Sequence, residues 1–149
     1  MKNYTMPQFM QALNRMSADV RGNALRKAAL AGGQLVQGYA EVNVMETFKN
    51  VTGNLAGSMQ TDVTSASPDR VVVEVGPTAI YGRIQELGGE IKPLTAKRLH
   101  WVDEDGNHRT ALSVTLPARP YLAPALEDNE SEVIDAMGDV LRQAIEGAL

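Results

Sequence analysis

Apolar residues at helical spacing dominate the first third of the chain. A helix is predicted over residues 7–19, because apolar residues recur there at three- and four-residue steps: Phe9, Leu13, Met16 and Val20. The same period resumes in residues 22–45 and predicts a second helix that ends at about Met45. Gly32, Gly33 and Gly38 lower the helix propensity of this segment, but they leave small surfaces where another element can come close.

The pattern then changes to alternating and β-branched residues. Residues 55–66 and 70–76 predict two strands, and the second contains the run Val-Val-Val-Glu-Val. Pro68-Asp69 between them is a turn sequence. We therefore expect these two strands to pair as a hairpin.

A short helix is expected next, from Ala79 to Leu87, and Gly88-Gly89 ends it. Two further strands are predicted over residues 98–102 and 111–116. Asp105-Gly106 lies between them, so we expect a second hairpin with an acidic loop.

A proline-rich segment from Leu116 to Leu126, here called the strap, joins the last predicted strand to the last predicted helix. It has three prolines within eight positions, and each fixes φ and removes an amide donor, so we expect a rigid extended connector until the third has passed. It also carries Tyr121, Leu122 and Arg119, which are suited to docking on another surface. A strongly amphipathic helix is predicted over residues 125–147.

Together these elements predict one α+β domain over residues 1–149. We expect N-terminal helices, a four-stranded, mainly antiparallel sheet, and a C-terminal helix packed on the sheet. A hydrophobic content of 44% suits one domain with its own core, whereas only 5% aromatic residues disfavour a large aromatic-lined pocket. The chain has no cysteine, which excludes disulfides and thiolate sites. No stretch is long enough to span a membrane, so we expect a cytoplasmic protein without a membrane partner.

Charge is distributed unevenly along the chain. The net charge of -4 argues against broad affinity for nucleic acid. Residues 1–50 hold six Lys or Arg against three Asp or Glu, whereas residues 121–149 hold one against seven. Either the two ends face opposite charges, within one chain or between neighbouring copies, or the acidic end is a solvated helix face, which is the interpretation we favour.

The second predicted hairpin is the strongest candidate for a metal site. His100 and His108 flank its loop, with Asp103, Glu104 and Asp105 nearby as oxygen ligands. Asp-Gly is also the sequence that a tight hairpin turn needs, and acidic tips are ordinarily solvated. We therefore favour a turn and expect no metal.

No catalytic signature is complete elsewhere. Glu86 is a candidate general acid or base beside Tyr81 and Arg83, but the sequence does not place it in a cleft. Lys97-Arg98 and Trp101 are a candidate platform for single-stranded nucleic acid, although a half-buried strand with exposed cations is the favoured interpretation. Nucleophile-elbow and phosphate-loop sequences are missing. We expect no enzyme activity, no cofactor and no specific nucleic-acid binding.

Four segments, taken in order, resemble the neck and tail-component proteins of long-tailed bacteriophages, the gene-product-ten-like family of head-tail joining and tail-completion proteins. They are Thr52–Ser58, Tyr81–Gly88, Ile91–Pro93 and Pro117–Leu126. Each is loose alone, but the set covers most of the chain in a fairly specific order. The family often has a proline shortly before its Thr-Gly, whereas Val42–Val51 has none.

The resemblance implies a structural virion protein that forms a ring, a hexamer by analogy, in the neck between the capsid connector and the tail tube. Its partners are then itself, a head-completion or connector protein, and the tail tube or a terminator protein. We expect an interface that includes Arg119, Tyr121, Leu122, Arg83 and Glu86. We expect the acidic loop to face a lumen through which DNA passes without sticking, with three carboxylates: Asp103, Glu104 and Asp105.

Two alternatives stay open from the sequence. The first is a terminator ring that caps the tail tube, which has a similar size and class of fold. The second, from a different class, is a small enzyme that uses Glu86 with His100. The expected location is the virion, with the host cytoplasm as the place of assembly.

Overall fold

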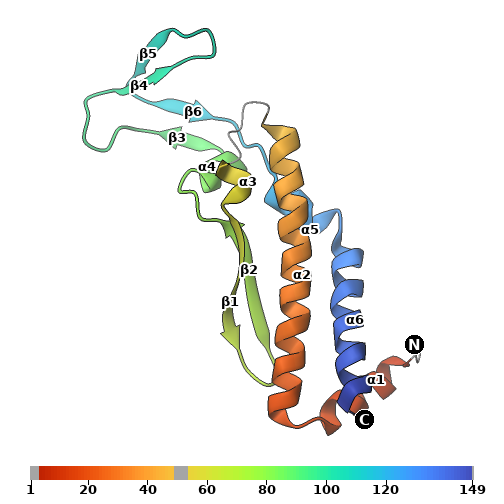
Figure 1. Cartoon of the computed structure of the whole chain (residues 1–149). Coiled ribbons are helices and arrows are strands. Elements are labelled where there is room, and N and C mark those ends of the chain that lie inside the picture. The colour runs from red at the N-terminus through yellow and green to blue at the C-terminus, as the bar shows by residue number, and fades with distance from the viewer. Residues whose placement is uncertain (1–3, 49–53, 149) are drawn as a thin grey trace.

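A long central helix contacts many of the other elements of the fold (Figure 1). The structure, a computed structural model, describes residues 4–48 and 54–148. In chain order the elements are α1 (Met6–Arg15), α2 (Ala18–Thr47), α3 (Asn54–Gly57), β1 (Met59–Ala66), β2 (Val71–Pro77), α4 (Gly82–Leu87), β3 (Gly89–Ile91), β4 (Leu99–Val102), β5 (His108–Ala111), β6 (Val114–Leu116), α5 (Leu122–Glu127) and α6 (Glu130–Ala148). The α+β class, the N-terminal helices and the C-terminal helix are confirmed.

Helix α2 packs against the β1–β2 hairpin on one side and against α5 and α6 on another. Two adjacent glycines make both contacts close. A Cβ added at Gly32 would lie 2.8 Å from the Met137 side chain of α6, and one added at Gly33 would lie 2.6 Å from Thr61 and 2.7 Å from Val73 of the hairpin. The largest cluster of buried residues surrounds these contacts and comprises Val36, Ala40, Val44, Leu55, Ala56, Met59, Tyr121, Ala125 and Val133.

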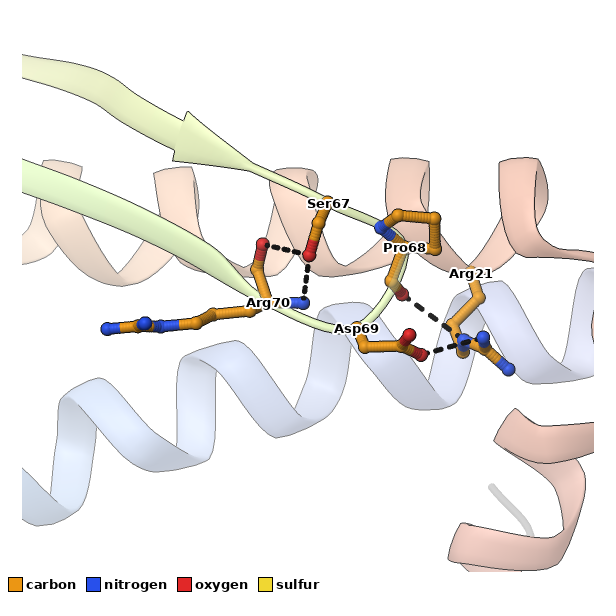
Figure 2. A network of polar contacts seen from close by, with 5 residues as sticks. All are labelled: Arg21, Ser67, Pro68, Asp69 and Arg70. Carbon is orange, nitrogen blue, oxygen red and sulfur yellow. Dashed lines mark hydrogen bonds and ion pairs between the residues drawn. The ribbon is translucent and has the colours of Figure 1, made fainter.

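The β1–β2 hairpin is antiparallel, as predicted, with pairs from Met59↔Pro77 to Ala66↔Val71. Its turn is fixed to the start of α2 (Figure 2). The Arg21 guanidinium donates to the Pro68 carbonyl at 3.2 Å and pairs with the Asp69 carboxylate at 2.7 Å. The hairpin is therefore held along its length by the glycine contact and at its tip by this cation.

The predicted four-stranded sheet is wrong. In the part of the chain that the structure describes, the strands form three separate two-stranded sheets, β1–β2, β3–β6 and β4–β5. The predicted pairing of residues 98–102 with residues 111–116 is also wrong, because β4 pairs with β5, while β6 returns to pair with β3. The C-terminal helix accordingly packs on α2 and not on a broad sheet.

Residues 89–116, here called the arm, form the last two of these sheets. In Figure 1 the two ribbons follow one another away from the helices, with β4–β5 at the far end. Within the described residues, β4 and β5 make their main contacts with each other, and so do β3 and β6. The arm thus projects from the body instead of covering it.

Several helix boundaries differ from the predictions. Helix α1 ends at Arg15, because the Ser17 hydroxyl accepts from the Val20 amide at 3.4 Å and begins α2. The strap is not extended throughout, since α5 includes Pro124 as its third residue, where a helix needs no amide donor. Residues 125–147 are divided between α5 and α6. Thr52-Gly53, with which the first segment of the family resemblance begins, lies outside the described residues.

Two glycines of α2, one in close contact and one facing open space, predict opposite effects for alanine substitutions. Gly33→Ala should lower the free energy of unfolding by about 1–2 kcal/mol, because the new methyl group overlaps two stiff β-branched side chains. Gly38→Ala should raise it by about 0.5–1 kcal/mol, because an added Cβ meets no atom within 4 Å and alanine favours the helix. Urea denaturation followed by circular dichroism measures both. Equal changes for the pair would contradict this packing.

Candidate functional site

The Glu86 carboxylate joins α4 to the strap at a point we call the junction. It accepts hydrogen bonds from the backbone amides of Tyr121 at 2.7 Å, Leu122 at 2.9 Å and Ala123 at 3.0 Å. These amides lie at the start of α5, where a helix leaves its first donors unpaired and favours a negative charge. Glu86 therefore caps α5 from a different element.

Tyr121 is a fully enclosed strap residue at the junction, with 1% of its surface exposed. Its hydroxyl donates to the Gly82 carbonyl at 2.9 Å, and its own carbonyl accepts from the Asn43 side chain at 2.9 Å. Its ring meets the edge of Phe48 at a centroid distance of 6.3 Å. Burial, and then the charge of Glu86, raises the pKa of Tyr121 from 10.0 to about 12.

Gly82 is required at this position because its neighbours leave no room for a side chain. An added Cβ would lie 2.3 Å from Pro77 and 3.1 Å from the Tyr121 hydroxyl. The strap is fixed further along by the Arg119 amide, which donates to the Gln85 carbonyl at 2.9 Å. The end of β2, helix α4 and the strap are thus in direct contact.

The five residues predicted for an interface are brought together here, but in different environments. Tyr121 is buried, while Leu122 and Glu86 are partly buried. Arg83 and Arg119 are exposed, and the Arg119 guanidinium lies 5.9 Å from the centre of the Phe48 ring. Tyr121 and Glu86 thus have internal contacts that account for their positions, and an interface role for the set stays a prediction.

The acidic loop at the tip of the arm is a well-bonded turn. One Asp103 oxygen accepts from the amides of Asp105 at 3.1 Å and Asn107 at 2.8 Å, and the other pairs with Arg109 at 2.7 Å. The hydrogen bond from Arg109 is the main cause that holds the pKa of Asp103 below its usual range. Gly106 takes a φ of 81°, as the turn requires. Asp103 therefore organises the turn.

The two histidines of the arm are not directly opposite each other. His108 pairs with Val102, and His100 pairs with Thr110, so the histidines lie diagonally on one face of the ribbon. Among the described residues, no group of three or more His, Cys, Asp or Glu side chains could hold a metal ion. Glu86, at the junction, bonds three backbone amides, whereas His100 belongs to the arm.

A groove on the body lies beside the junction. It lies between β2, α2, α5 and α6, with a volume of about 600 Å³, and we call it the α2 groove. Its walls are mostly apolar and include Gly32, Gly33, Val71, Val73, Val75, Leu126 and Met137. Two carboxylates, Glu86 and Glu127, complete the lining. No sequence pattern indicated this groove, because its walls come from four separate elements.

Comparison with known proteins decides the class of protein. A family model described as the phage virion morphogenesis family matches residues 11–146. The chain belongs to this family. Neither the curated proteins nor the solved structures gave a match.

For this phage virion morphogenesis protein, the coarse part of the resemblance seen in the sequence is confirmed. Family membership supports a structural or assembly role in a bacteriophage virion. The matched region runs from within α1 to near the end of α6, so it includes the junction, the arm and the α2 groove. Across the described residues, no helix is both long and apolar enough to cross a membrane.

Removal of the Glu86 carboxylate should destabilise the junction. Glu86→Ala should lower the free energy of unfolding by about 2–3 kcal/mol, because three amides lose a charged acceptor and the start of α5 loses its cap. The matched control is Glu74→Ala, at an exposed position of β2 opposite Asp62, where the change should stay within about 0.5 kcal/mol. Chemical denaturation measures both. Similar values for the two variants would contradict the capping role.

Tyr121 should make stability depend on pH in the alkaline range. Its pKa is raised by folding, so its contribution is complete below pH 10 and is lost as the pH rises towards 12. Tyr121→Phe should be less stable by about 1–2 kcal/mol at neutral pH, because the buried Gly82 carbonyl loses its donor. The difference between wild type and variant should shrink from pH 10 to 12. Tyr39, whose pKa Glu132 raises, is unchanged in both proteins. A difference that is constant with pH would contradict this assignment.

Proposed function

We propose that this protein is a subunit of a ring in the neck of a long-tailed phage, where it completes the tail and joins it to the head. The observation that carries the proposal is the arm, which extends from the body and makes few contacts with it. Isolated two-stranded ribbons are marginally stable in water. An arm of this kind is well suited to binding a neighbouring subunit.

The surface of the arm supports a role in assembly. Several large apolar side chains are exposed on it, namely Leu94 at 100%, Leu112 at 67%, Val102 at 55% and Trp101 at 40%. Each would be stabilised by burial, at about 25 cal/mol per Å² of apolar surface removed from water. Four large apolar side chains exposed on one projecting segment support a role of the arm in binding another protein.

The charge distribution supports a head-to-tail contact between copies. Exposed bases Arg26 and Lys27 lie on α2, whereas exposed acids follow α5 and α6: Glu127, Asp128, Glu130, Glu132 and Asp135. A ring forms when two different surfaces of the same subunit complement each other and the rotation closes. Opposite charges on two surfaces would attract each other across such a contact.

Inactivation of the gene in the phage provides the test. Cells should then accumulate DNA-filled heads and separate tails of normal length, because the subunit that joins them is missing. Electron microscopy of the lysate measures both, and antibody labelling of wild-type particles should mark the head-tail junction. A plasmid copy of the gene is the control and should restore joined particles.

Two outcomes would contradict this position. Tails of uncontrolled length would favour the terminator ring that caps the tail tube. Absence of the chain from mature particles would contradict any structural place in the virion.

A further inference from the structure

We infer that the arm of one copy binds in the α2 groove of the next copy, as an added strand beside β2. This inference rests on the proposed ring and specifies the two surfaces that close it. The contact would be of the heterologous kind, since an arm and a groove are different parts of the same chain.

The edge of β2 explains why a strand would fit. In the described chain β2 pairs with β1 alone, so its other edge has no strand beside it. The α2 groove is lined by Val71, Val73 and Val75 of β2, but by no residue of β1, which places it along that free edge. An unpaired edge offers a row of amide and carbonyl groups that another strand can pair with.

Apolar character matches between the two surfaces. The groove is lined mainly by valine, leucine, alanine and methionine side chains, so apolar side chains of a partner would meet apolar walls there. The arm carries exposed Trp101 and Val102 on opposite faces of β4. A ribbon that inserts one of them would bury apolar area on both partners.

Charge also matches. Glu127 lines the groove, and Asp128 and Glu130 follow it as exposed residues at the α5–α6 turn. The loop that leads into β4 carries exposed Lys97 and Arg98. An arm lying along β2 with this loop towards α5 would bring the two bases to the acidic rim, which selects one orientation of the strand.

The arm of the same chain is not placed to fill its own groove. In Figure 1 it leaves the body beside α4, and its β4–β5 tip lies far from α6. A second copy is therefore the partner that fits this surface, because it supplies an identical arm free to approach from outside.

Engineered cysteines test the contact directly, because the chain has none of its own. Val102→Cys protein mixed with Leu126→Cys protein should form a disulfide-linked dimer under mild oxidation, and neither variant alone should form it in comparable yield. Leu112→Cys provides a second arm position in case Val102→Cys fails to fold. The matched control replaces Leu126→Cys by Asp62→Cys, on the exposed face of β1 away from the groove. The arm–groove pair should give on the order of tenfold more linked dimer than the control pair, because binding raises the effective concentration of the thiols.

A charge exchange tests the orientation. Arg98→Glu should reduce the yield of linked dimer, and Glu127→Lys in the partner should restore it, with both effects weakening at high salt. Equal crosslinking of the arm–groove and control pairs would overturn the inference. Rings seen by electron microscopy without the arm–groove crosslink would also overturn it, while leaving the proposed function intact. If the gene-inactivation experiment contradicted the neck position while the crosslink still formed, the proposed function would be wrong and the arm–groove contact would stand.

Discussion

The fold depends on how closely other elements can approach α2. This helix must bury the hairpin on one side and α6 on another, and neither of those elements has a second large partner in the described chain. Consecutive glycines at positions 32 and 33 solve the problem, because residues next to each other in a helix point about 100° apart and so serve two different contacts. The helix loses some intrinsic propensity at these positions, and tertiary packing compensates for the loss.

The junction fixes the position of the arm relative to the body. Glu86 fixes α4 to the start of α5, and Gly88, at a φ of 69°, lets the chain turn into β3 against the backbone of the strap. An added Cβ at Gly88 would lie 2.6 Å from the Ala118 amide nitrogen, so the two crossing segments are held at backbone contact. The direction in which the arm leaves the body is therefore determined by backbone and carboxylate contacts, and only weakly by apolar packing.

Much of the local structure could be predicted from the sequence, whereas partners far apart in the chain could not. Helical periodicity indicated α2 and the C-terminal helix, and the valine run with Pro68-Asp69 indicated the first hairpin. Residues 111–116 looked like one strand, yet a break at Leu112-Ser113 divides them between two ribbons, because alternation shows a strand and not its partner. The capping role of Glu86 had only an indirect signal, since Tyr121, at the N-cap position of α5, makes no capping hydrogen bond with its side chain.

The entry and exit of the arm lie side by side, since Gly89 pairs with Leu116. Residues 89–116 therefore leave and rejoin the body at one place, and the main contacts between the elements of the body do not involve them. Such a segment can gain or lose residues in opposed pairs along its two ribbons without changing the register of anything beneath it. Within a family of assembly proteins, this makes the reach of the subunit a property that evolution can alter separately from its stability.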